Sequence, residues 1–305
     1  MGNSLPIAAA MNLYFLHILF SLLAADLPTM GKEKLVYGKD DVLFAKIEEQ
    51  QSDTPFGSLL DAGTGMHSLR WIATLGDKGM TSFTAVTADT TMQKNVQDEA
   101  ERLGVHEGNH IIVGNWFGNL DLPHDQYDTI LADYLIGALD GFSPYRQEEM
   151  IQKLVSCLKP GGRLYIVGLE PIPDFVEGPA NVICKVRQVR DACILLAGHR
   201  MYREYPIEWI QQQVEKIPKV VIKETTTFPI LYRYNTIVRQ LDVGRRKFPL
   251  FPKTNLAKAM KELVDELDEE ALELTKDGPI KFGFDYVVSV QKTLLDESEI
   301  SGQCE

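Results

Sequence analysis

The sequence predicts an α/β protein whose mostly parallel sheet carries helices on both faces. Short apolar runs alternate with helical stretches over residues 57–170, as in successive strand–helix–strand units. Apolar runs of this kind are typical of strands that are buried on both faces. Glycines, acids and amides follow several of the runs, at the edge where parallel sheets bind their ligands.

The elements of the first half follow one another regularly. A charged helical stretch at residues 32–51 ends at DTPFG. The segments expected to form strands are SLLDAG, SFTAVT, HIIVG, YDTILADY and RLYIVGLE. The segments expected to form helices are HSLRWIATLG, TMQKNVQDEAERLG and YRQEEMIQKLVSCL, and KPGG (159–162) is expected to be a turn.

The second half is less regular. We expect one or two helices with a Tyr- and Arg-rich joint over residues 182–217, and then a strand at KVVIKETTTFPIL. The stretch NLAKAMKELVDELDEEALELTK predicts a long acidic helix with a solvated face, and FGFDYVVSVQK predicts a final strand. These elements indicate a single domain over residues 31–295, followed by a loose acidic tail at 296–305.

Residues 1–30 differ from the rest of the chain. No residue from Leu5 to Ala25 carries a formal charge, and LYFLHILFSLLAA is strongly apolar. Two interpretations remain open: a signal or membrane anchor, and a helix docked on the domain. The location therefore stays open between cytoplasmic and secretory, organellar or membrane-associated, with membrane contact expected only through residues 5–25.

The composition restricts the class of partner. The formal net charge is −12, whereas non-specific nucleic-acid binding needs a basic surface, so no nucleic-acid partner is expected. The four cysteines form no CxxC pair, which indicates neither a zinc site nor a redox dithiol. We expect no metal, and the oligomeric state stays open.

The stretch LLDAGTGMHSLRW (59–71) joins the first strand of the alternating region to its first helix. Two glycines alone are weak evidence for a cofactor site, because many tight turns need glycine for its backbone freedom. Four further segments strengthen the prediction: TADTT after the second strand, GNW after the third, ADY after the fourth and LKPGG before the fifth. Together they predict a nucleotide-type cofactor site at one edge of the sheet.

These segments resemble the class I S-adenosylmethionine-dependent methyltransferases. The glycine motif is similar to the first motif of that family, and LKPGGRLYIV is similar to its turn into strand five. The resemblance covers residues 59–170 well and extends weakly to residue 292. It implies a Rossmann-like seven-stranded sheet of order 3-2-1-4-5-7-6 with an antiparallel last strand, S-adenosyl-L-methionine as the cofactor and S-adenosyl-L-homocysteine as the product.

The resemblance implies cofactor contacts for residues that follow the first two strands. Asp61, Gly63 and Gly65 are expected to shape the loop against the methionine part of the cofactor. The acid that binds the ribose in the family is replaced by Thr87, and Asp89 comes two residues later. Either Asp89 reaches back to the ribose, or the ribose is held otherwise.

The next two strand ends carry the remaining candidates. Asn115 stands where the family often has an Asp for the adenine amino group, and its side-chain oxygen can accept the same hydrogen bond. Trp116 is expected against the adenine face or, alternatively, in the core. Asp133 and Tyr134 are expected beside the methyl group, as catalytic candidates, and Asp133 also as a cofactor ligand. His67, at the place of an optional third glycine, is the third catalytic candidate.

A dinucleotide-dependent oxidoreductase is the competing interpretation. Such a protein needs G-x-G-x-x-G after the first strand and an acid directly after the second. Here Ser68 stands at the third glycine, Thr87 stands at the acid, and KPGG has no role in that scheme. These departures favour the methyltransferase.

Methyl transfer from a sulfonium needs mainly alignment and exclusion of water, and a base only if the acceptor must lose a proton. The family places substrate-covering insertions at about residues 171–215 and 229–281. The residues expected to bind the substrate are Glu170, His199, Arg200, Tyr202 and Arg233, and the arginines suit a carboxylate or phosphate. We expect a small-molecule acceptor under a helical lid. A protein or peptide substrate and an inactive binding module with this fold are the alternatives.

Overall fold

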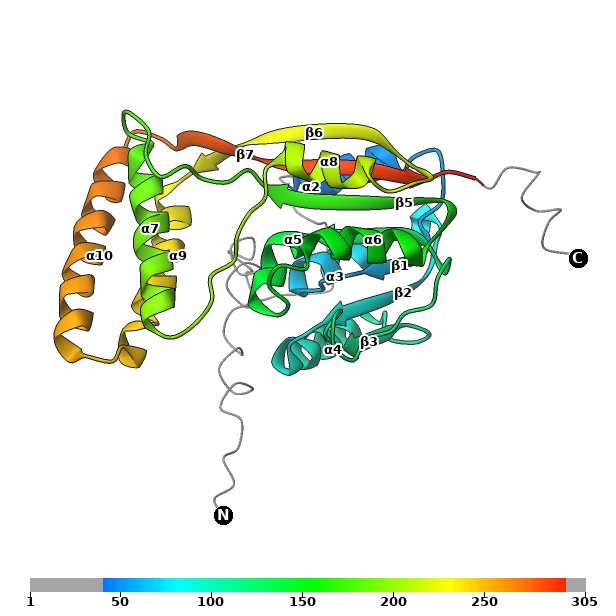
Figure 1. Ribbon diagram of the computed structural model, residues 1–305, viewed down its shortest axis with the longest axis horizontal. Coiled ribbons are helices and arrows are strands. Elements are labelled where there is room, and N and C mark those ends of the chain that lie inside the picture. The colour runs from blue at the N-terminus through cyan, green and yellow to red at the C-terminus, as the bar shows by residue number, and fades with distance from the viewer. Residues whose placement is uncertain (1–40, 295–305) are drawn as a thin grey trace, which may run out of the picture.

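The computed structural model describes residues 41–294, and seven strands within them form one sheet (Figure 1). The strand order is β3-β2-β1-β4-β5-β7-β6. Strands β1 to β5 are parallel, and β7 runs antiparallel to both β5 and β6, which confirms the predicted fold class and strand order. The strands are β1 (Gly57–Asp61), β2 (Met80–Thr87), β3 (His110–Val113), β4 (Tyr127–Asp133), β5 (Leu158–Leu169), β6 (Val220–Tyr232) and β7 (Ile280–Lys292).

Helices lie between the strands in sequence and cover the sheet in space. The helices are α2 (Val42–Gln50), α3 (Met66–Ile72), α4 (Thr90–Leu103), α5 (Leu135–Ala138), α6 (Gln147–Cys157), α7 (Asn181–Leu196), α8 (Ile207–Glu215), α9 (Tyr234–Arg245) and α10 (Thr254–Thr275). Three short 3-10 helices, η2 (Gly76–Lys78), η3 (Leu139–Gly141) and η4 (Phe248–Leu250), complete the described elements.

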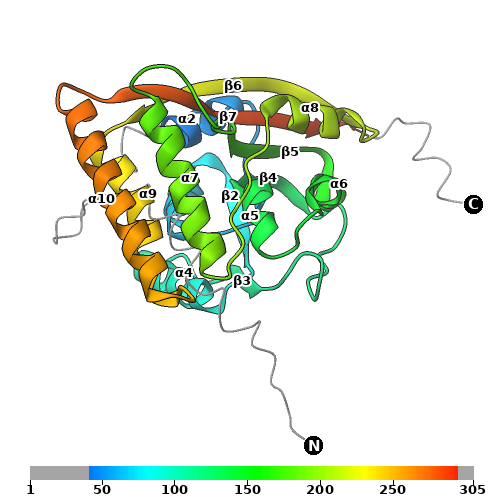
Figure 2. The same ribbon diagram turned by 60° about the vertical axis from the view of Figure 1, so that its left-hand side comes forward.

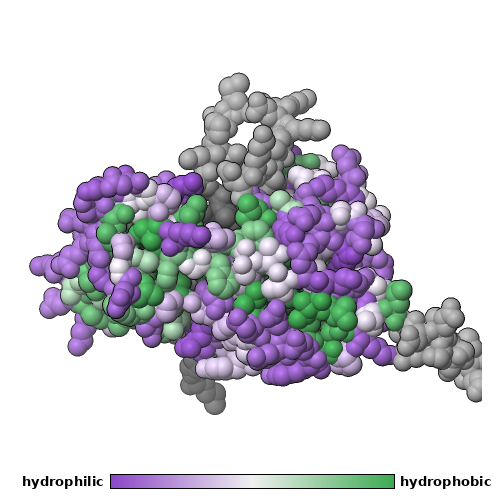
Figure 3. All heavy atoms as spheres, turned by 90° about the horizontal axis from the view of Figure 1, so that it is seen from above, coloured by the Kyte–Doolittle hydropathy of each residue, from purple (hydrophilic) through white to green (hydrophobic). Residues whose placement is uncertain are grey.

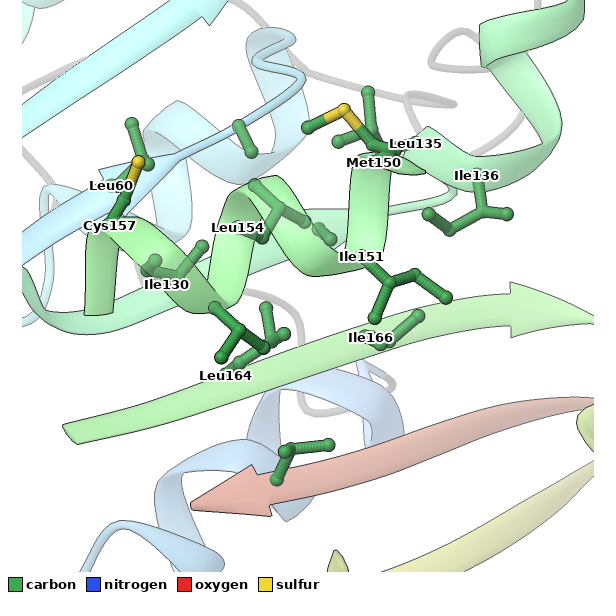
Figure 4. Close-up of a cluster of buried hydrophobic side chains, with 14 of the residues drawn as sticks. Leu60, Ile130, Leu135, Ile136, Met150, Ile151, Leu154, Cys157, Leu164 and Ile166 are labelled. Atoms are coloured by element: carbon green, nitrogen blue, oxygen red, sulfur yellow. The ribbon is translucent and has the colours of Figure 1, made fainter. Parts of the chain in front are cut away.

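Each face of the sheet has its own core, because successive residues of a strand point to opposite sides. Leu59 packs with side chains of α2, α3 and α4, whereas Leu60 packs with those of α6 and α8. Figure 4 shows Leu164 of the sheet beside Leu154 of α6 in this second core. Leu154 is fully buried, so its replacement by Ala is expected to cost about 2–5 kcal/mol of unfolding free energy.

The segment KPGG belongs to strand β5 as an irregularity and is not a separate turn. Tyr127 of β4 pairs with Leu158, but Thr129 already pairs with Arg163, so β5 contains extra residues between them. Gly161 has a φ of +84°, a conformation that side chains with a Cβ rarely adopt. The prediction of a turn at this place is therefore corrected to a glycine-dependent bulge within the strand.

The helices α7, α9 and α10 form a unit of their own, here called the three-helix unit. Figures 1 and 2 show them side by side, at the end of the sheet to which β6 and β7 extend. Val186 of α7, Leu241 of α9 and Val264 of α10 share one buried cluster. Both ranges expected to cover the substrate contribute to this unit, while α8, which lies in the first range, packs on the sheet.

The expectations for residues 1–30 and 296–305 lie outside the described residues. Among the helices of residues 41–294, none has the length and apolar character that a membrane crossing requires. Figure 3 shows a face on which polar residues cover most of the surface and apolar side chains gather in separate patches.

Candidate functional site

A cavity lies at the carboxyl ends of β1, β2, β3 and β4, where a parallel sheet is expected to bind its ligand. Its empty volume is about 560 Å³, including the part open to solvent. The residues that line it are Ala62, Gly63, Val86, Thr87, Ala88, Gly114, Asn115, Trp116, Asp133, Tyr134, Leu135, Ala138, Leu139, Phe142 and Tyr202. Seven of them were candidates from the sequence: Gly63, Thr87, Asn115, Trp116, Asp133, Tyr134 and Tyr202.

The loop after β1 is organised around Asp61, which is fully buried and is not among the residues that line the cavity. The Ser68 hydroxyl donates a hydrogen bond of 2.6 Å to Asp61 Oδ2 and accepts one of 3.1 Å from the Gly65 backbone N–H. Burial raises the pKa of Asp61 to about 6, although the hydrogen bond from Ser68 acts to lower it. Asp61 Oδ1 has no hydrogen-bond partner within residues 41–294.

Asp133 and Tyr134 stand where β4 ends and α5 begins. Asp133 is only 3% exposed, and its Oδ2 lacks a hydrogen-bond partner in the described part of the chain. Burial, together with the nearby Asp61, Asp41 and Asp285 carboxylates, raises the pKa of Asp133 well above its usual value. An acid that is buried without a partner is costly, so Asp133 is a candidate for contact with a ligand.

Tyr134 adopts a left-handed backbone conformation, with φ +48°, which is uncommon for a bulky residue and costs free energy. This conformation places its ring beside the cavity and lets its hydroxyl donate a hydrogen bond of 2.8 Å to Asp285 Oδ1. Burial raises the pKa of the Tyr134 phenol well above its usual value, and Asp285, Asp133 and Glu204 add to this. The phenol therefore stays protonated at neutral pH.

Thr87 lines the cavity at the end of β2, but Asp89 has another role. The Asp89 carboxylate caps α4 by accepting a hydrogen bond of 2.8 Å from the Met92 backbone N–H. The Asp89 backbone N–H in turn donates to Thr87 Oγ1 over 3.2 Å. Asp89 is not among the lining residues, so Thr87, and not the acid, borders the cavity at the end of β2.

Asn115 and Trp116 both line the cavity, and both side chains form hydrogen bonds with backbone groups. Asn115 Oδ1 accepts hydrogen bonds from Phe117 N–H (3.0 Å) and the Ser143 hydroxyl (2.7 Å), and Nδ2 donates to Phe142 O (3.1 Å). The oxygen expected to meet the adenine amino group thus already has two donors. Trp116 is 4% exposed and donates its indole N–H to Ala62 O over 2.8 Å.

His67 lies on the side of α3 that carries α2, outside the lining of the cavity. Its Nε2 is 2.5 Å from Asp41 Oδ2, and its ring stacks on Phe44 with centroids 5.0 Å apart. Asp41 also caps α2 by accepting from the Phe44 backbone N–H. His67 therefore fastens α2 to α3, and we assign it no part in the reaction proposed below.

Of the residues expected to bind the substrate, only Tyr202 lines the cavity. Glu170 accepts a hydrogen bond of 3.1 Å from the Ile207 backbone N–H, at the start of α8. His199 Nδ1 lies 3.0 Å from Lys247 Nζ, and Arg233 is exposed at the start of α9. Arg200 Nε donates to Asp140 O over 3.1 Å, so the expected carboxylate-binding arginines are directed elsewhere.

Sequence reasoning did not identify Glu204 and Asp285. Glu204 belongs to the segment between α7 and α8, residues 197–206, here called the joint. A Cβ built on Gly137 of α5 would lie 2.7 Å from Glu204 Oε2, so the joint packs directly on α5. Burial raises the pKa of Glu204 to about 7 and that of Asp285 to about 6. The only sequence signal was an acid within GHRMYREY and within FGFDYVV.

The fold recurs in solved structures of other proteins. A candidate methyltransferase from Bacillus halodurans is similar with a TM-score of 0.53 and 14% identity, over 82% of this chain and 98% of that one. The YcgJ protein from Bacillus subtilis has a TM-score of 0.51 and 17% identity, over 83% and 99%. A candidate sarcosine dimethylglycine methyltransferase from Galdieria sulphuraria has a TM-score of 0.50 and 13% identity, over 82% and 84%.

No protein-family model and no curated protein matches this sequence. At identities of 13–17% the likeness shows the fold alone. The chain therefore has the Rossmann-like fold found in methyltransferases, and its activity has to be inferred from its own site.

Proposed function

We propose that this chain is an S-adenosyl-L-methionine-dependent methyltransferase that acts on a small-molecule acceptor. The observation that carries the proposal is the convergence of four strand ends on one cavity. The residues that border it are Gly63 of the loop after β1, Thr87, Asn115, Trp116, Asp133 and Tyr134. They occupy the positions that the resemblance to class I methyltransferases implies for the cofactor site.

The residues present fit this cofactor. The cavity has the size of a small-molecule site and is lined mainly by apolar side chains with a few polar groups. A Cβ on Gly63 would lie 3.0 Å from Leu135 Cδ1, so the loop runs close to α5. Asp133 Oδ2, in the lining of the cavity, is a buried acceptor that lacks a donor within residues 41–294, and the ammonium of the cofactor has the donor that it lacks.

The bound cofactor supplies an electrophilic methyl group on its sulfonium. The chain contributes orientation, exclusion of water and a place for a proton. Tyr134 serves as a hydrogen-bond donor rather than as a base, because its raised pKa keeps the phenol protonated. Asp285 and Glu204, with pKa values of about 6 and 7, are the groups that exchange protons near neutral pH.

The joint supports a small acceptor. Tyr202 of the joint lines the cavity, and a Cβ on Gly141 would lie 2.8 Å from its ring. The joint thus covers the site at close range, as a lid over a small substrate would, and such a cover excludes water from the reaction.

Methyl-labelled S-adenosylmethionine tests this proposal. The full chain is incubated with the labelled cofactor and an extract that is separated afterwards into metabolites and proteins. We expect label in the metabolite fraction, strongly reduced for Asp133→Asn and unchanged for Asp98→Asn, an exposed carboxylate on α4. Label confined to the protein fraction would contradict a small acceptor, and no transfer above background would contradict the activity.

A further inference from the structure

The cavity at the strand ends contains few polar side chains. Among the described residues that line it, Asp133 is the only carboxylate, and its buried Oδ2 has no hydrogen-bond partner within residues 41–294. The proposed cofactor has two nitrogen groups that require an acceptor, the ammonium of its methionine part and the amino group of its adenine. Because a charged pair forms the stronger hydrogen bond, we expect the ammonium to meet Asp133. The adenine amino group then depends on another side chain.

Asn115 lines the cavity, but its side-chain oxygen is already occupied. This oxygen accepts hydrogen bonds from the Phe117 backbone N–H over 3.0 Å and from the Ser143 hydroxyl over 2.7 Å, which uses both of its lone pairs. The amide nitrogen of Asn115 donates to Phe142 O over 3.1 Å, and these three contacts fix which end of the amide is the oxygen. The Asn115 side chain therefore offers no acceptor to an amino group.

The remaining polar side chains of the lining do not distinguish an amino group from a keto group. The Tyr134 hydroxyl is directed to Asp285, which lies outside the lining. The Trp116 indole N–H donates to a backbone carbonyl. Thr87 and Tyr202 end in hydroxyl groups, and a hydroxyl can rotate either to accept from an amino group or to donate to a keto oxygen. These side chains therefore favour neither group.

We propose that the cavity binds the purine of the cofactor without distinguishing an amino group from a keto group at the same ring position, and that Ser143 sets this tolerance by occupying the Asn115 oxygen. This inference rests on the proposed function and assigns the specificity of its cofactor site. Apolar side chains of the lining, among them Val86, Leu139 and Phe142, hold the ring by burial, which does not depend on direction.

A matched pair of ligands tests this specificity without methyl transfer. S-adenosylhomocysteine and S-inosylhomocysteine, which carries a keto group in place of the adenine amino group, are titrated calorimetrically into the full chain. We expect their dissociation constants to agree within about threefold. Ser143→Ala releases one lone pair of the Asn115 oxygen, so this variant should prefer S-adenosylhomocysteine by a further factor of about three to ten, the contribution of one hydrogen bond. Ser52→Ala, at an exposed serine outside the lining, should leave the ratio unchanged.

The outcomes separate this inference from the proposed function. If the wild type binds S-inosylhomocysteine at least about tenfold more weakly than S-adenosylhomocysteine, the inference is overturned and the methyltransferase stays in place. An unchanged ratio in Ser143→Ala overturns the part assigned to Ser143. If that variant does not fold, Ser143→Cys takes its place with the same expected change, because a thiol is a weak donor. Failure of both ligands to bind contradicts the proposed function, and this inference with it.

Discussion

The Tyr134 hydroxyl donates a 2.8 Å hydrogen bond to Asp285, joining the end of β4 to β7 across the intervening strand β5. The two residues are 151 positions apart in sequence. This contact connects the cavity to the antiparallel part of the sheet and keeps an acid of pKa about 6 beside it. Tyr134 also carries a strained left-handed backbone, and strain of this kind is often retained at functional sites.

Replacing Tyr134 by Phe removes this hydrogen bond and preserves the ring. Because the hydrogen bond holds the pKa of Asp285 down, its loss should raise that pKa further and reduce the fraction of Asp285 that is ionised and able to accept a proton at neutral pH. We expect kcat to fall by about tenfold to a hundredfold, whereas the affinity for S-adenosylhomocysteine stays close to that of the wild type. A variant with unchanged kcat would show that the contact is only structural.

Replacing Ser68 by Ala tests the support of the glycine loop. The substitution removes the 2.6 Å hydrogen bond to Asp61, so the pKa of Asp61 should rise above about 6. A buried group that loses its partner costs about 1–3 kcal/mol. Cofactor affinity at pH 7 should therefore fall, and it should recover partly at pH 8, where Asp61 is ionised. Calorimetric titrations at both values measure this, and equal losses at both would exclude the pKa as the cause.

Activity should rise with pH through the pKa of Glu204, about 7. Below this value the carboxyl is protonated and cannot accept a proton. Burial raises this pKa first, and Asp285 and Asp191 add to it, while Arg190 opposes them. Tyr134 is surrounded by the same acids and stays protonated. Kinetic constants measured from pH 5.5 to 8.5 should show kcat increasing through about pH 7, and a flat profile would exclude Glu204 as the group that exchanges the proton.

Ionisation of Glu204 also affects stability, but in the opposite direction: the free energy of unfolding should fall as pH rises. The folded pKa of Glu204 lies above its usual value of 4.5, so its contribution to stability is present below about pH 4.5 and is lost as pH rises through about 7. Glu204→Gln should therefore raise the melting temperature at pH 8 relative to the wild type and change it little at pH 4.5. A lower melting temperature at pH 8 would mean that the carboxylate has a stabilising partner.

Gly137→Ala should disturb the joint without touching the cofactor loop. The added Cβ would lie 2.7 Å from Glu204 Oε2 and 3.1 Å from Arg203 O, so the joint must shift. We expect the KM for the acceptor to rise while the affinity for S-adenosylhomocysteine is retained. Gly76→Ala is the matched control, because nothing lies within 4 Å of its Cβ. If both variants keep the KM of the wild type, close packing of the joint is not needed for acceptor binding.

The alternation of strands and helices in the first half could be predicted from the sequence, and the strand order from the resemblance to the methyltransferases. Strands and helices alternate regularly up to Leu169, and the glycines after β1 mark the turn between β1 and α3. Local patterns of this kind specify elements well. The bulge in β5 was missed because KPGG has the composition of a turn whether or not its backbone pairs with a neighbouring strand.

The roles of single polar residues were harder to predict. Asp89 stands at the right distance from Thr87 for a ribose ligand, but it also precedes α4, and there its carboxylate caps the helix. His67 follows the glycine loop, yet the turn of α3 directs it to Asp41. Glu204 and Asp285 act on Tyr134 from segments far along the chain, although neither lines the cavity. A sequence alone does not show which face of a helix, or which distant acid, turns toward a cavity.

Calorimetric titration of S-adenosylhomocysteine into the full chain tests the central claim most directly. We predict a dissociation constant in the micromolar range, about −7 to −8 kcal/mol of binding free energy. The affinity should weaken at least about tenfold in Asp133→Asn, which removes a buried charge, and it should stay the same in Asp98→Asn. Binding weaker than about 1 mM by the wild type, or equal affinity in Asp133→Asn, would contradict the assignment of this cavity to the cofactor.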